Sequence, residues 1–335
     1  MRPPAVLVTG ASGFIGGWIA RGLADRGRRV RALYRREQPP AELVQLGERG
    51  AELMRGDLAD SAAARRAVDG VEGIVHAGGP AQYWGPEQLF RVGIWEATQR
   101  LLEASRAAGV RSFVYLSSLS VHGLGPHRDS TEEGPYYPLI TPYQRYKRLA
   151  EQAVIAANAR ELSTVVLRPG DVYGPGDRTT FYRLLYYQGR GVRGVIGSGR
   201  RLASLVYVED LAEAAMLALQ RREAAGQILN VTGGEKVTWR EVLDYTASLL
   251  GVRPWLNLPV PVARFAVVAI LEPLFSLVPL PVGQYLTRYA IEHVAHDFHF
   301  RIDKARRLLG FDPRIDWREG MRRTVRAYLE ERAAT

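Results

Sequence analysis

The amino-acid sequence predicts an α/β protein built on a doubly wound parallel sheet, with a smaller, mostly helical lobe toward its C-terminus. Two observations support this prediction. Short apolar runs alternate with amphipathic stretches over the first part of the chain, which is typical of strand–helix–strand units. After Pro169 the sequence changes to glycine-rich loops and a proline-broken apolar stretch, which indicates a second structural unit.

The elements are expected to alternate along the chain. Strands are expected at 6–9, 29–34, 52–55, 73–76, 112–117 and 163–167, with helices at 14–26, 87–108 and 142–159 between them. A later short strand within 205–210 leads into a helix at 211–220. We therefore expect a main domain over 1–169 with a return at about 200–225, and a substrate lobe over 170–199 and 226–335.

The composition limits the classes of function. The absence of cysteine excludes disulfides, zinc–thiolate sites and a cysteine nucleophile, and no metal site is expected. The net charge of +10 invites a nucleic-acid interpretation, but the arginines are spread along the chain and no nucleic-acid motif accompanies them. We expect no nucleic-acid partner. The first residues lead directly into a strand without a cleavable apolar segment, so a cytoplasmic location is expected.

A glycine-rich turn follows the first expected strand. Gly10 allows the tight turn, Gly13 allows a pyrophosphate to approach the backbone, and Gly16 allows the following helix to pack on the strand. The pyrophosphate then meets the positive end of the helix dipole. This context predicts a Rossmann domain that binds a dinucleotide. The other residues assigned to this part of the cofactor site are Ser12, Phe14 and Ile15.

The end of the second strand bears on the choice between NAD and NADP. An acidic residue there would accept hydrogen bonds from the ribose hydroxyls, but this chain has Tyr34 followed by Arg35 and Arg36. Two guanidinium groups suit a ribose 2′-phosphate, so NADP(H) is favoured over NAD(H). Further cofactor contacts are expected from the ends of later strands, at Asp57, Leu58, Ala77, Gly78 and Pro169.

A tyrosine and a lysine are placed to transfer a proton. Tyr143 and Lys147 are four residues apart on an expected helix, so their side chains share one face. An ammonium about 4 Å from a phenol favours the phenolate by about 4 kcal/mol at an effective dielectric of about 20. We therefore expect Lys147 to lower the pKa of Tyr143 and to hold the nicotinamide ribose. Ser118, at the end of the fifth strand, is expected to hydrogen-bond the substrate oxygen.

These segments resemble the extended short-chain dehydrogenase/reductases. The resemblance rests on Thr9–Gly16, Ser117–Gly123, Pro142–Lys147 and Leu167–Asp177. Within that superfamily the chain is similar to the branch of 3β-hydroxysteroid and sterol-4-carboxylate dehydrogenases, and its second strand is similar to that of dihydroflavonol reductases. The resemblance implies a triad of Ser118, Tyr143 and Lys147, hydride transfer at the nicotinamide and a homodimer. Family members often have serine where Tyr146 stands and asparagine where Gly93 stands.

Three classes of function remain open. The first is an oxidoreductase that interconverts a ketone and a secondary alcohol. The second is a sugar-nucleotide epimerase or dehydratase, although a dehydratase of this superfamily needs an Asp–Glu pair where this chain has Leu119 and Ser120. The third is a redox sensor that binds NADP without turnover. The intact tyrosine and lysine favour the first.

The substrate is expected to be hydrophobic. Residues 260–283 form an apolar stretch that Arg264, Glu272 and Pro273 interrupt, so it is too broken to span a membrane. It could serve as ordinary core, as a lid over the substrate or as a surface that dips into a membrane. The last two uses favour a steroid-like substrate or a β-keto or β-hydroxy acid. The expected pocket walls are Tyr83, Trp84 and Tyr173.

Overall fold

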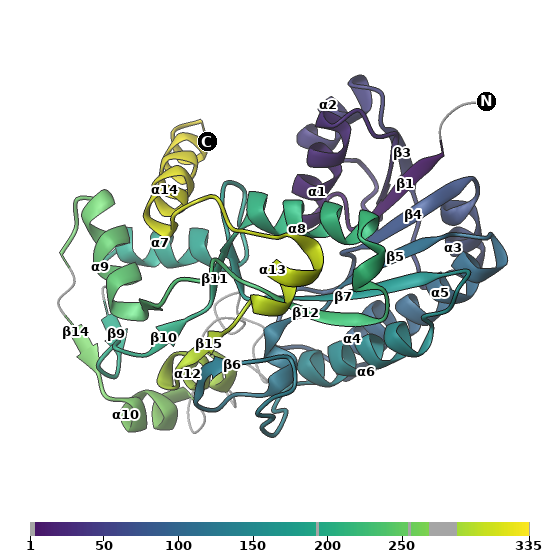
Figure 1. Ribbon diagram of the computed structural model, residues 1–335. Helices are drawn as coiled ribbons and strands as arrows, with labels where there is room; N and C mark the ends of the chain where they lie inside the picture. Colours follow the sequence, from purple (N-terminus) through teal and green to yellow (C-terminus); the bar gives the residue numbers. More distant parts are fainter. Residues whose placement is uncertain (1–3, 192–193, 254–255, 268–286, 335) are drawn as a thin grey trace.

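Seven parallel strands form the central sheet of the computed structural model, which describes residues 4–191, 194–253, 256–267 and 287–334 (Figure 1). Their order across the sheet is β12-β7-β5-β4-β1-β2-β3. The strands are β1 (Ala5–Thr9), β2 (Val30–Tyr34), β3 (Glu52–Arg55), β4 (Val71–His76), β5 (Ser112–Leu116), β7 (Ser163–Pro169) and β12 (Gln227–Val231). The predicted doubly wound α/β fold is confirmed.

The centre of the sheet is the place where the strand order reverses. All five residues of β1 are buried, as expected of an apolar run in the middle of a parallel sheet. Strand β1 pairs with β2 on one side and with β4 on the other, so the strand order reverses at this point. In such sheets, ligands bind in the crevice beyond the carboxyl ends of the strands at the reversal.

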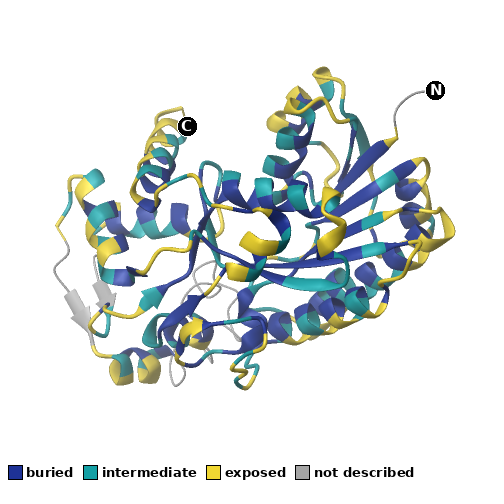
Figure 2. Cartoon of the chain, viewed as in Figure 1, coloured by how far each residue is buried: buried dark blue, intermediate teal, exposed yellow. Residues whose placement is uncertain are grey.

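Helices cover both faces of the sheet. One face carries α1 (Phe14–Asp25), α2 (Ala41–Glu48), α8 (Val208–Gln220) and α13 (Asp303–Leu309). The other carries α3 (Ser61–Val68), α5 (Ala97–Ala107) and α6 (Pro142–Ala156). The helix expected at 87–108 is built from α4 (Glu87–Phe90), a π-helical segment η1 (Arg91–Glu96) and α5. The middle strands of the sheet, such as β1 and β5, are buried along almost their whole length, whereas no residue of the edge strand β3 is buried (Figure 2).

The lobe contains further helices and short paired strands. Its helices are α7 (Phe181–Gly189), α9 (Trp239–Leu249), α10 (Val260–Phe265), α12 (Arg288–Ala295) and α14 (Trp317–Ala333). The paired strands are β8 (Asp171–Tyr173) with β11 (Leu205–Tyr207), β9 (Gly194–Ile196) with β14 (Leu256–Leu258), β10 (Leu202–Ala203) with β13 (Val237–Thr238), and β6 (His127–Ser130) with β15 (Phe298–Phe300). The described part of the chain also contains two 3₁₀ turns, η2 (Leu119–His122) and η3 (Arg222–Ala224).

The expected domain boundary at residue 226 needs a correction. Strand β12 pairs in parallel with β7 and forms the edge of the central sheet, not part of the lobe. Helix α13 packs against β12 and α8, so it also covers the sheet. The chain therefore enters the lobe, returns to the sheet and leaves it again. The reason is that an edge strand of five residues looks like any other short apolar run in the sequence.

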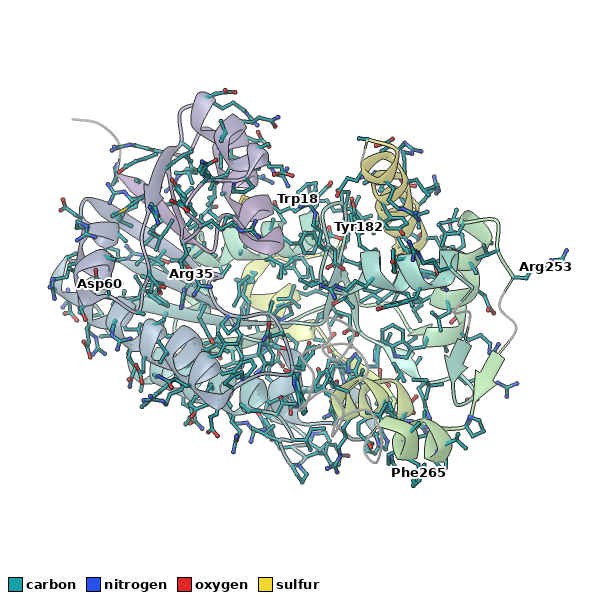
Figure 3. The ribbon with its side chains drawn as sticks, turned by 180° about the vertical axis from the view of Figure 1, so that it is seen from behind. Trp18, Arg35, Asp60, Tyr182, Arg253 and Phe265 are labelled. Atoms are coloured by element: carbon teal, nitrogen blue, oxygen red, sulfur yellow. The ribbon has the colours of Figure 1, made fainter. Side chains whose placement is uncertain are left out.

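The apolar stretch expected at 260–283 is described only as far as Val267. There, Ala263 and Val267 are buried, whereas Phe265 is 67% exposed and projects from the edge of the lobe (Figure 3). The remaining residues, 268–283, lie outside the described residues, so the three uses weighed for this stretch stay open. None of the helices in the described part of the chain has the length and apolar character needed to cross a membrane.

Candidate active site

The amino end of α6 is fixed by a capping box. Thr141 accepts a hydrogen bond from the backbone of Gln144, whose side-chain oxygen accepts from the backbone of Thr141 in return. Pro142 occupies the first turn, where its missing N–H costs nothing. The amide nitrogen of Gln144 also donates to the carbonyl of Ser120 at 3.0 Å. These contacts lock the start of α6 onto the segment after β5.

The buried face of α6 carries the predicted proton-transfer pair, and the end of β5 lies against it. The hydroxyls of Ser118 and Tyr143 are hydrogen-bonded to each other. The ammonium of Lys147 donates to the carbonyl of Leu116 at 2.7 Å. Ser117 points elsewhere, because its hydroxyl donates to Glu151 at 2.8 Å. The structure thus brings Ser118, Tyr143 and Lys147 together. Ser117 is not part of this group, because its hydroxyl bonds with Glu151.

The electrostatics of Tyr143 differ from the expectation. Burial raises its pKa to about 12, and the hydrogen bond with Ser118 opposes that rise. Lys147 is itself buried, and burial lowers its pKa to about 8, against the opposing effect of Glu151. The lysine nitrogen lies 5.9 Å from the centroid of the Tyr143 ring. The expected strong lowering of the tyrosine pKa by Lys147 is therefore wrong, because desolvation dominates this pKa and the lysine is not among the groups that shift it.

The turn after β1 has the form of a phosphate cradle. Gly10 adopts a φ of +67°, and a Cβ there would lie 2.9 Å from the Cα of Gly78. A Cβ on Gly16 would lie 2.3 Å from the carbonyl oxygen of Gly10, so only glycine allows α1 to pack this closely. Gly13, the exposed residue before α1, provides no side-chain cap. The first amides of α1 are therefore offered to a ligand, and these residues fit a dinucleotide pyrophosphate.

The remaining predicted cofactor residues follow the carboxyl ends of several strands of the central sheet. The amide of Gly78 donates to the hydroxyl of Thr9 at 3.0 Å, which holds the loop after β4 against β1. The others differ in exposure: Ser12, Phe14, Ile15 and Ala77 are half-buried, Leu58 and Pro169 are buried, and Arg36 is exposed. His76 is buried between the hydroxyls of Thr9 and Thr98, and burial lowers its pKa to about 3. His76 therefore packs in the core.

Arg35 directly follows β2, in the half of the molecule that holds the central sheet (Figure 3). Its side chain is 73% exposed, and the guanidinium lies 3.7 Å from the carboxylate of Asp57. An exposed pair at this distance contributes little to folding stability. The guanidinium thus remains able to bind an anionic group at the edge of the crevice.

Aromatic side chains enclose Tyr143. The ring of Tyr83 contacts it edge to face, with centroids 5.0 Å apart, and Phe90 lies at 6.4 Å. Trp84 is half-buried beside Tyr83, in the loop after β4. The expectation for Tyr173 is corrected, because this residue is 1% exposed and packs in the core of the lobe. Its hydroxyl donates to the carbonyl of Trp317 at 3.3 Å.

Sequence reasoning missed two residues on α12. Tyr289 stacks on Tyr83, and His293 stacks on Tyr289 with ring centroids 5.7 Å apart. The Nε2 atom of His293 lies 2.9 Å from the carboxylate of Asp171. The four-residue spacing of Tyr289 and His293 was the available signal, but helical spacing alone does not say what a helix packs against. Within the described ranges, no three metal-ligating side chains gather in a way that could hold an ion.

Comparison with known proteins finds a matching family model, similar sequences and similar solved structures. The model of the NAD dependent epimerase/dehydratase family matches residues 6–232. The chain is 32% identical over 327 residues to a 2-alkyl-3-oxoalkanoate reductase of Stenotrophomonas maltophilia (strain K279a), covering 95% of this chain and 97% of that protein. It is 29% identical over 342 residues to a 3 beta-hydroxysteroid dehydrogenase/Delta 5-->4-isomerase of Mycobacterium tuberculosis (strain ATCC 25618 / H37Rv), covering 97% and 90%. The solved structure of MoeE5 in complex with UDP-glucose and NAD is 30% identical, with a TM-score of 0.77 and coverage of 99% and 100%.

Proposed function

Because this chain belongs to the NAD dependent epimerase/dehydratase family, we propose that it is an oxidoreductase that interconverts a ketone and a secondary alcohol on a hydrophobic substrate. The observation that carries the proposal is the hydrogen-bonded pair of Ser118 and Tyr143, with Lys147 one turn along the same helix face. A plain carbonyl reduction needs one proton donor and one group that orients the oxygen. This arrangement supplies both.

The residues of the chain divide the work as follows. A bound nicotinamide dinucleotide would supply or accept the hydride. The hydroxyl of Ser118 hydrogen-bonds the carbonyl oxygen, and the hydroxyl of Tyr143 donates a proton to that oxygen during reduction. Lys147 holds a positive charge beside the phenol and hydrogen-bonds the ribose. The glycine turn at 10–16 binds the pyrophosphate.

The surroundings of Tyr143 favour a hydrophobic substrate. Its neighbours Tyr83, Phe90 and Tyr289 present aromatic rings. Pockets of this character bind apolar ligands and orient them with a few polar groups. The relative from Stenotrophomonas maltophilia is named as a reductase of 2-alkyl-3-oxoalkanoates, which are β-keto acids with alkyl chains. We infer a substrate of this β-keto acid type or a steroid-like ketone.

NADP(H) is the inferred cofactor form. Arg35 and Arg36 are exposed at the carboxyl end of β2, where the adenosine ribose lies in this fold. A 2′-phosphate carries two negative charges that a guanidinium can grip with charge-assisted hydrogen bonds. The acidic side chain that would select NAD is absent from this position, where Tyr34 stands.

A sugar-nucleotide enzyme is the second candidate. The structure of MoeE5 contains UDP-glucose and NAD, and its identity to this chain is close to that of the reductase relative. The two candidates differ in what the lobe must bind, since a nucleoside diphosphate needs cationic and polar partners. The aromatic stack beside Tyr143 favours the ketone reductase.

A substrate panel with matched variants tests the proposal. Purified enzyme is mixed with β-keto acids, steroid ketones, flavanonols, aliphatic ketones and UDP-sugars, and nicotinamide absorbance is followed with NADPH and NADH. We expect turnover of a hydrophobic ketone, and Tyr143→Phe should reduce kcat by about 10²- to 10⁴-fold. The control is Tyr146→Phe, on the same helix but bonded outward to Glu87. Turnover of UDP-sugars alone, or unchanged kcat in Tyr143→Phe, would exclude the proposed reaction.

A further inference from the structure

A buried carboxylate continues the face of α6 that carries the catalytic pair. Tyr143, Lys147 and Glu151 are spaced four residues apart, so they lie on successive turns of one helix face. Glu151 is 3% exposed. A carboxylate in such surroundings is costly unless it is paired and hydrogen-bonded.

Glu151 is paired on two sides. Its Oε2 atom accepts from the hydroxyl of Ser117 at 2.8 Å and from Nε of Arg168 at 3.0 Å. Its Oε1 atom accepts from Nη2 of the same arginine at 2.5 Å. Arg168, at the end of β7, is 2% exposed and also donates to the carbonyl of Glu132 at 3.0 Å. The pair is therefore a fully bonded link between α6, β5 and β7.

The end of β5 matches this helix face residue by residue. The carbonyl of Leu116 accepts from Lys147, the hydroxyl of Ser117 donates to Glu151, and the hydroxyl of Ser118 bonds with Tyr143. Three consecutive residues of the chain thus contact three successive turns of α6. Of these three contacts, only the one to Glu151 ends on a group outside the proposed chemistry. Ser117 lies between Leu116 and Ser118 in the chain, so holding Ser117 fixes the backbone that carries the other two contacts.

We propose that Glu151, anchored by Arg168, is a positioning residue that aligns Ser118 with Tyr143 and keeps the ammonium of Lys147 in place beside them. The role rests on the proposed function of Tyr143 and Lys147. It assigns to Glu151 no contact with substrate or cofactor. Instead, the carboxylate holds the end of β5 through Ser117. Its negative charge also favours the protonated form of the buried Lys147.

The groups that face Lys147 support this assignment. The lysine nitrogen lies 4.9 Å from the ring centroid of Tyr115 on β5 and 5.9 Å from that of Tyr143. From β4 it faces His76, which burial keeps neutral. Burial lowers the pKa of Lys147, and Glu151 opposes that effect. Removing the charge of Glu151 should therefore make the lysine lose its proton at lower pH.

The lysine content of the chain permits a direct measurement. Only three lysines occur, Lys147, Lys236 and Lys304. Replacing the last two with arginine preserves their charges and leaves Lys147 as the single lysine. In protein labelled with ¹³C-lysine, the Cε resonance then reports the titration of Lys147 alone, without any substrate. Glu151→Gln should lower its midpoint by about one unit or more.

The variants separate alignment from charge. Ser117→Ala removes the contact to β5 but keeps the pair with Arg168, so it should lower kcat by about 10-fold while the Lys147 midpoint stays the same. If Glu151→Gln fails to fold, Glu151→Asp is measured in its place. This variant keeps the negative charge, so the titration midpoint of Lys147 should stay the same. An unchanged midpoint in folded Glu151→Gln, or an unchanged kcat in Ser117→Ala, overturns the assignment. The titration midpoint of Lys147 is measured without substrate. A failure of this assignment can therefore be told apart from a failure of the proposed reaction.

Discussion

The rings of Tyr83 and Tyr289 stack face to face, with centroids 3.7 Å apart and planes inclined by 11°. Tyr83 belongs to the loop after β4, and Tyr289 belongs to α12 in the lobe. The stack thus joins the two parts of the molecule beside Tyr143, the proposed proton donor, whose ring touches the edge of Tyr83. Contact with this stack accounts in part for the burial that raises the pKa of Tyr143.

Tyr83→Ala should remove this wall. A hydrophobic substrate loses an aromatic contact, so we expect its KM to rise by about 10-fold or more. The exposed Tyr143 should also have a lower pKa, because its burial is the main cause of the rise. The alkaline limb of kcat/KM for reduction should therefore move to lower pH, which rate measurements across the alkaline range will show. Tyr83→Phe keeps the stack and serves as the control. A limb that stays in place in Tyr83→Ala would contradict this account.

Arg35→Ser should change cofactor preference. The substitution removes a guanidinium from the edge of the crevice, so kcat/KM for NADPH should fall by about 10-fold or more, with little change for NADH. Arg111→Ser is the matched control, because this side chain is 70% exposed, against 73% for Arg35, and lies before the amino end of β5. Equal losses with both cofactors would show that Arg35 does not contact a 2′-phosphate.

Gly16→Ala should destabilise the folded chain. The added methyl would lie 2.3 Å from the carbonyl oxygen of Gly10, which cannot move without opening the turn. We expect a loss of about 2 kcal/mol or more in the free energy of unfolding, measured by urea denaturation. Gly189→Ala is the control, since a methyl there meets nothing within 4 Å. A loss of the same size in both variants would rule out the steric cause.

His76 should make stability depend on pH. Its pKa in the folded chain is about 3, below the ordinary value of 6.5, because burial opposes its charge. The unfolded chain therefore binds the proton first as the pH falls. This contribution to stability is complete above pH 6.5 and falls as the pH drops toward 3, so that about 2 kcal/mol of it is lost at about pH 5. His76→Gln should unfold in urea with a smaller difference between pH 7.5 and pH 5. An unchanged difference would refute the prediction.

The sequence predicted the strands well because their signals are local. Buried parallel strands such as β1 are continuous apolar runs, and the glycine turn that follows has a fixed spacing. Spacing also placed Tyr143 and Lys147 on one face. It could not give the depth of burial, which depends on what packs against that face. For this reason the direction of the Tyr143 pKa shift was predicted wrongly.

Long-range contacts account for the rest. Tyr289 lies 146 residues after Tyr143 in the sequence, and nothing near it indicates that α12 approaches the active site. Strand β12 has the same limitation, since pairing with β7 decides its place. Tyr173 has an aromatic ring suited to a pocket wall or to a core, and only the packing of α14 decides between them.

The returns of the chain to its sheet limit how the protein can be divided. Helix α8, which packs on α1 and on β4, β5 and β7, comes after the first segment of the lobe, as does β12. A fragment that ends at Pro169 would lack both and would expose the apolar face that α8 covers. We expect such a fragment to aggregate when expressed alone. A chimeric protein made with a relative would likewise need a junction at each point where the chain passes between sheet and lobe. No single junction divides the chain into two fragments that each fold alone.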